Sequence, residues 1–111
     1  MKAPITTHIL DLQYGKPASG ICVSLFNDKA PERVCQGTTD ADGRVSQWDT
    51  HFELSPGNWT LSFATDKWFS DQYRPSFYSD ILIAFKVESV KQHYHVPLLL
   101  SAFGYSTYRG S

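Results

Sequence analysis

The chain has 111 residues, with 10 basic and 11 acidic side chains and a formal net charge of −1. This length suits a single domain, and we expect residues 1–111 to form one. The balanced charge disfavours nucleic acid and membrane surfaces as partners, because both attract strongly basic proteins. With 41% hydrophobic and 14% aromatic residues, the chain can still fill a core.

Alternation of apolar and polar residues predicts a series of short β-strands. The first runs from Ile5 to Leu12 and places Ile5, Thr7 and Ile9 on one face, with Thr6 and His8 on the other. Further strands are expected at 21–26, 32–38 (polar, at a sheet edge), 44–48, 58–65, 81–87, 94–100 and from 105 onwards.

Turns and one short helix separate these strands. Asp42-Gly43 is a strong tight-turn signal, and the residues from Asp66 to Gln72 are the one plausible helix, with Asp66 as its N-cap. Short strands with a turn every ten or so residues indicate an all-β sandwich.

No targeting or membrane segment is expected. Met1-Lys-Ala-Pro4 leads directly into the first strand without the apolar stretch of a secretory signal. No apolar run approaches the roughly 20 residues of a membrane span, and the C-terminus is not a Ser-Lys-Leu peroxisomal signal. We therefore expect a cytoplasmic protein and disfavour a periplasmic or peroxisomal location.

The two cysteines, Cys22 and Cys35, form no CxxC motif and no metal-ligand spacing. We expect two reduced thiols that pack as small apolar groups, with a disulfide as the alternative.

The residues able to carry chemistry are few. Histidines occur at positions 8, 51, 93 and 95, and their spacing matches no metal-ligand pattern, so we expect neither metal nor cofactor. On a strand, His93 and His95 share one face. Taken singly, His8, Arg44 and His95 each have an ordinary structural explanation, as a hydrogen-bonding strand histidine or a solvated charge.

Four places in the chain carry a more specific pattern. They are residues 7–11 (THILD) with 15–18 (GKPA), 39–44 (TDADGR), 78–85 (YSDILIAF), and 93–101 (HYHVPLLLS) with the terminal Tyr-Arg-Gly-Ser. Together they span nearly the whole chain, and it resembles the 5-hydroxyisourate hydrolase family, the transthyretin-related proteins of purine degradation.

This resemblance implies a fold, an assembly and an activity. The fold would be a transthyretin (prealbumin)-like β-sandwich of two four-stranded sheets with one short helix. The assembly would be a homotetramer, a dimer of dimers with its sites between subunits. The reaction would be hydrolysis of 5-hydroxyisourate to 2-oxo-4-hydroxy-4-carboxy-5-ureidoimidazoline in urate degradation.

The family's site residues fall on named positions of this chain. The implied catalytic residues are His8, Arg44, His95 and Ser111. The implied substrate-binding residues are His8, Arg44, Tyr108, Arg109, Gly110 and Ser111. In transthyretin itself the two histidines, the arginine and the C-terminal tail (residues 108–111, Tyr-Arg-Gly-Ser) are replaced, so their presence here favours the enzyme.

Elementary chemistry agrees with these residue types. Attack of water on a ring carbonyl needs a general base that titrates near neutral pH, which histidine supplies. The developing oxyanion needs a fixed positive charge, which arginine supplies. The sequence does not decide which of His8 and His95 is the base. Two other classes stay open: a transthyretin-like binding protein for an aromatic molecule such as a thyroid hormone, and an immunoglobulin-like interaction domain.

Overall fold

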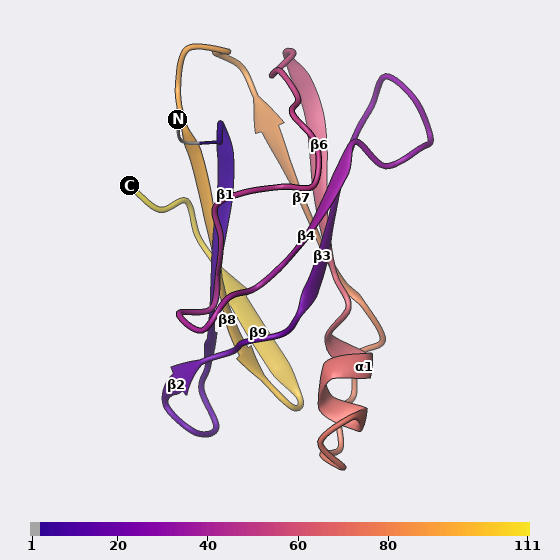
Figure 1. Cartoon of the computed structure of the whole chain (residues 1–111), viewed down its shortest axis with the longest axis vertical. Helices are drawn as coiled ribbons and strands as arrows, with labels where there is room; N and C mark the ends of the chain where they lie inside the picture. Colours follow the sequence, from indigo (N-terminus) through magenta and orange to yellow (C-terminus); the bar gives the residue numbers. More distant parts are fainter. Residues whose placement is uncertain (1–2) are drawn as a thin grey trace.

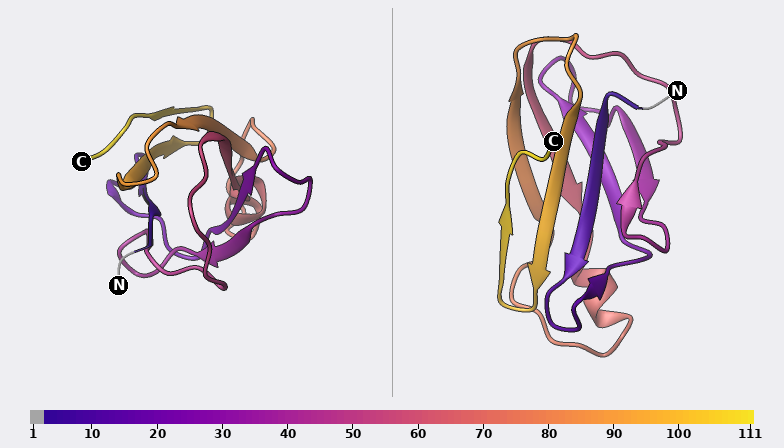
Figure 2. Two further views of the ribbon diagram at one scale, coloured as in Figure 1. Left: turned by 90° about the horizontal axis from the view of Figure 1, so that it is seen from above. Right: turned by 90° about the vertical axis from the view of Figure 1, so that its left-hand side faces the viewer.

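Two β-sheets face each other across the core in the computed structural model, which describes residues 3–111 (Figures 1 and 2). The first sheet contains β1 (Ile5–Asp11), β2 (Lys16–Pro17), β5 (Arg44–Val45), β8 (Tyr94–Ser101) and β9 (Gly104–Thr107). The second contains β3 (Cys22–Asn27), β4 (Cys35–Thr38), β6 (Gly57–Phe63) and β7 (Ile81–Val87). The expectation about Met1 and Lys2, that no signal segment begins there, lies outside the described residues.

The strand order is β2-β1-β8-β9 in the first sheet and β4-β3-β6-β7 in the second. The predicted sandwich is confirmed. The first sheet has five strands because two short strands, β2 and β5, pair one after the other with the same edge of β1. β4 is an edge strand, as its polar sequence predicts.

The core lies between the sheets and follows the alternation of the sequence. In β1 the side chains of Ile5, Thr7 and Ile9 are buried, and in β6 those of Trp59, Leu61 and Phe63. The alternation predicted for the first strand is therefore confirmed, and β6 shows the same pattern.

Several element boundaries differ from prediction by one to three residues, and the short strand β2 was not predicted. The strand predicted at 44–48 ends at Val45, since the Trp48 indole N–H instead donates to the Ile5 carbonyl at 2.8 Å. The strand predicted at 32–38 begins only at Cys35. The helix α1 is Thr65–Ser70, so Ala64 occupies the N-cap position and Asp66, the predicted cap, lies in the first turn. A carboxylate in the first turn still favours the helix, through the helix dipole.

Both cysteines are free thiols, and the β3–β4 register pairs Cys22 with Thr38 and Cys35 with Leu25, not with each other. Burial, reinforced by the carboxylate of Asp49, raises the pKa of Cys35 to about 12. The Cys35 thiol therefore stays neutral in the core. No helix within residues 3–111 is long and apolar enough to cross a membrane.

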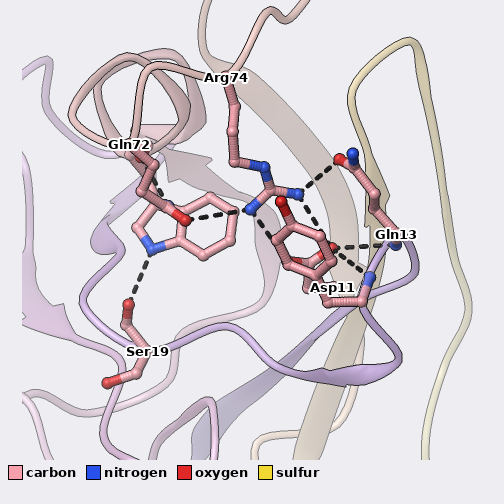
Figure 3. Close-up of polar contacts among 7 residues, drawn as sticks. Asp11, Gln13, Ser19, Gln72 and Arg74 are labelled. Atoms are coloured by element: carbon pink, nitrogen blue, oxygen red, sulfur yellow. Dashed lines mark hydrogen bonds and ion pairs between the residues drawn. The ribbon is translucent and has the colours of Figure 1, made fainter.

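A buried ion pair ties the end of β1 to the loop after α1 (Figure 3). Arg74 Nη1 donates to Asp11 Oδ2 at 3.0 Å, and the two side chains are 8% and 4% exposed. Arg74 also donates to the side chains of Gln13 and Gln72. Its guanidinium lies over aromatic rings, with the Tyr14 ring centroid 4.4 Å away, and its Nε is buried without a hydrogen-bond partner.

We expect Arg74→Met to lower the free energy of unfolding by about 3–5 kcal/mol, because it leaves Asp11 buried without its counter-charge. Urea denaturation measures this loss. The control is Lys67→Met, which breaks the exposed Lys67–Asp71 pair and should leave stability unchanged. Equal behaviour of the two variants would show that the buried pair has no special role.

Candidate active site

Parallel pairing of β1 with β8 sets two strand faces side by side. Thr6 pairs with His95, and His8 pairs with Pro97. Since Ile5, Thr7 and Ile9 point into the core, Thr6 and His8 belong to the opposite, outer face, and His95 lies on that same face. His8 and His95 are both half-buried.

Arg44 reaches this face from β5, where it pairs with His8. The preceding turn holds it in place: the Asp40 carboxylate accepts the Arg44 N–H at 3.0 Å, and Asp40 N–H donates to the Arg44 carbonyl at 3.0 Å. Gly43 has φ +76°, and a methyl group there would lie 2.5 Å from the Ile9 carbonyl oxygen. The predicted Asp-Gly turn is thus what positions the arginine.

The His95 ring is hydrogen-bonded to a buried threonine. Thr6 Oγ1 lies 2.8 Å from His95 Nδ1 and 3.1 Å from His93 Nε2, and Thr6 is only 4% exposed. The two imidazoles stack, with ring centroids 6.4 Å apart and planes inclined by 17°. Sequence reasoning left His93 without a role and overlooked Thr6, because nothing in the alternation shows that β1 pairs with β8.

The C-terminal tail docks on β8 of its own chain. Gly110 N–H donates to the His95 carbonyl at 2.8 Å, and the two residues form an isolated β-bridge. Arg109 donates to Gln92 Oε1 at 2.9 Å, and its guanidinium lies 4.6 Å from the Tyr94 ring centroid. The tail therefore passes directly beside His95.

A pocket of about 200 Å³ opens between these elements. Its lining residues are Thr6, Thr7, Arg44, Val45, Ser46, His93, His95 and Ser111. The pocket thus joins three of the predicted catalytic residues, Arg44, His95 and Ser111. His8 is the register partner of Arg44 but does not line the pocket.

The remaining predicted residues lie elsewhere. Tyr108 and Arg109 line a separate hollow of about 270 Å³ against β7 and β8. Gly110 lies beside His95, to whose carbonyl it donates its backbone N–H. His51 lines a third hollow, formed by the loop after β5. Within residues 3–111, no three His, Cys, Asp or Glu side chains gather where a metal ion could be held.

The architecture is that of a transthyretin-like sandwich with a histidine- and arginine-lined pocket on the outer face of one sheet. The chain belongs to the HIUase/Transthyretin family, whose family model matches residues 5–110.

Individual relatives agree with this membership. The 5-hydroxyisourate hydrolase of Salmonella dublin is 40% identical over 109 residues, which cover 96% of this chain and 80% of the relative. A solved structure of Klebsiella pneumoniae 5-hydroxyisourate hydrolase superposes with a TM-score of 0.84 at 36% identity, covering 96% of this chain and 92% of that one. Sea bream transthyretin in complex with thyroxine superposes with a TM-score of 0.88 at 26% identity, covering 97% and 95%. The fold alone therefore does not separate the two kinds of relative.

Gly110 limits the space beside His95. A methyl group on it would lie 2.5 Å from His95 Cδ2 and 3.3 Å from Pro97 Cγ. We expect Gly110→Ala to displace the tail or the imidazole, seen as a shift of the His95 Cε1–H resonance in ¹H–¹³C spectra. The control is Gly104→Ala, where the nearest atom to the new methyl is 3.9 Å away. An unchanged His95 resonance in Gly110→Ala would contradict the close packing.

Proposed function

We propose that this protein hydrolyses 5-hydroxyisourate to 2-oxo-4-hydroxy-4-carboxy-5-ureidoimidazoline, a step of urate degradation. The observation that carries the proposal is the pocket in which His95, Arg44 and Ser111 meet. The identity to 5-hydroxyisourate hydrolases over nearly the whole chain supports it. No cofactor enters the proposal, and the expected cytoplasmic location stays a prediction.

The reaction is attack of water on a ring carbonyl of the substrate. A C–O bond forms while one proton of the water passes to a histidine, and the ring C–N bond then breaks as the nitrogen regains a proton. We assign the base to His95, because it lines the pocket and its Nδ1 is already oriented by Thr6. His8 pairs with Arg44 but does not line the pocket, so its contact with the substrate or protonation of the leaving nitrogen stays a prediction.

Arg44 supplies the positive charge for the substrate oxygens. Its side chain is exposed at the pocket, and guanidinium donors suit the planar, oxygen-rich edge of a purine-like ring. Ser111 lines the same pocket, where its hydroxyl can contact the substrate or the attacking water. Arg109 anchors the tail through Gln92, and a substrate contact by Tyr108 stays a prediction.

The proposal includes a homotetramer with sites between subunits. A pocket of about 200 Å³ is below the roughly 300–1,000 Å³ usual for ligand sites, so a neighbouring subunit would complete its walls. The pocket also lies on an outer sheet face, which an adjacent subunit can cover. Light scattering measures this assembly directly.

The first test generates 5-hydroxyisourate from urate with urate oxidase and follows its ultraviolet band. We expect the protein to accelerate the decay, and His95→Ala to lower the rate by about 100- to 10,000-fold, the usual contribution of a general base. His51→Ala is the control, because this histidine lies outside the pocket. Absence of any acceleration by the folded wild-type protein would favour the alternative, binding of an aromatic molecule such as thyroxine, which rests on the fold.

Removal of residues 108–111 provides a second test. We expect loss of activity, since Ser111 and the Gly110 contact to His95 both disappear. The melting temperature should change little, because residues 108, 109 and 111 are exposed and none of the four belongs to the core. Wild-type turnover by the shortened chain would exclude the tail from the site.

A further inference from the structure

The Thr6 hydroxyl is a buried group that joins two histidines at the pocket. Its oxygen is within hydrogen-bond distance of His95 Nδ1, at 2.8 Å, and of His93 Nε2, at 3.1 Å. A solvated serine or threonine makes such contacts transiently, but Thr6 is 4% exposed and is held in the β1–β8 ladder opposite His95. The two contacts are therefore a fixed part of the fold.

A hydroxyl has one proton, and this links the protonation of the two rings. If Thr6 donates to His93 Nε2, it accepts from a protonated His95 Nδ1, and neutral His95 then carries its lone pair on Nε2. If Thr6 donates to His95 Nδ1 instead, neutral His95 carries its proton on Nε2 and has no basic nitrogen for the pocket. Of these two arrangements, only the first lets His95 accept a proton from water.

We propose that Thr6, backed by His93, is a positioning residue that holds His95 in the Nδ1–H tautomer and so directs the basic Nε2 of His95 to the pocket. This inference rests on the proposed function, because it explains how His95 serves as the base. When His95 takes up a proton, Nδ1–H keeps the same acceptor, so Thr6 also stabilises the imidazolium without rearrangement.

A second contact restrains the opposite edge of the ring. Gly110 passes so close to His95 Cδ2 that a side chain has no room there, while Thr6 holds Nδ1. The imidazole is thus clamped between β1 and the tail, which limits rotation about its Cβ–Cγ bond. Such outer partners of a functional histidine fix both its tautomer and its orientation.

The test compares Thr6→Val, which keeps the branched shape and strand propensity but loses the hydroxyl, with Thr6→Ser, which keeps the hydroxyl. Two readouts are used: steady-state turnover of 5-hydroxyisourate, and ¹⁵N spectra of the histidine rings recorded without substrate in mildly alkaline buffer, where neutral imidazole predominates. Circular dichroism and thermal unfolding confirm that both variants are folded.

We expect wild-type His95 to show a protonated Nδ1 and an unprotonated Nε2, and His93 to show an unprotonated Nε2. Thr6→Val should shift His95 toward the Nε2–H tautomer and lower kcat by about 10- to 100-fold with little change in KM, as loss of an outer partner usually does. Thr6→Ser should keep the wild-type tautomer of His95, and its kcat should stay within about threefold of wild type. His93→Phe should give a smaller loss, because Thr6 can then either donate to or accept from His95.

Two results would overturn the inference. One is an Nε2–H tautomer of His95 in the wild-type protein, and the other is wild-type kcat in a folded Thr6→Val variant. The outcome is separable from the proposed function. If the wild-type protein has no hydrolase activity, the proposed function is rejected. The ¹⁵N spectra need no substrate, so they test the effect of Thr6 on the His95 tautomer independently. An active wild type with an active Thr6→Val keeps the function and rejects the positioning role.

Discussion

Parallel pairing between β1 and β8 is the constraint on which the remaining structure depends. It joins two segments almost ninety positions apart, such as Thr6 and His95, in a single register. That register directs Ile5 and Ile9 into the core and His8 to the outer face. A slip of one residue would exchange the two faces and bury polar side chains, so the apolar core enforces the geometry of the pocket.

The other parts of the site attach to this pair from three directions. The Asp-Gly turn before β5 places Arg44 along the edge of β1 that faces away from β8. The tail places Gly110 and Ser111 beside β8. His93 joins through Thr6. Each addition uses backbone pairing or a buried hydroxyl, which restrict motion more than a surface contact between long side chains does. A pocket built this way is largely preorganised for chemistry.

Below the site, the Asp11–Arg74 pair performs a different task. Asp11 follows the inward alternation of β1, where a charge is costly, and Arg74 arrives from the loop after α1 to compensate it (Figure 3). The pair connects the sheet that carries the pocket to the segment that connects β6 and β7. The Arg74 guanidinium also lies over the Tyr14 ring, a cation–π contact that favours this position of the arginine.

Local alternation, turn chemistry and motifs were enough to predict the all-β class, the two faces of β1, the turn before Arg44 and, by resemblance, the family. The sequence also indicated His8, Arg44, His95 and Ser111 as candidates. The three-dimensional structure was needed to show that β1 lies parallel to β8, that Arg74 neutralises Asp11, that Thr6 bridges His93 and His95, and that Tyr108 and Arg109 line a separate hollow. These facts arise from contacts between residues distant in the chain, which no local pattern encodes.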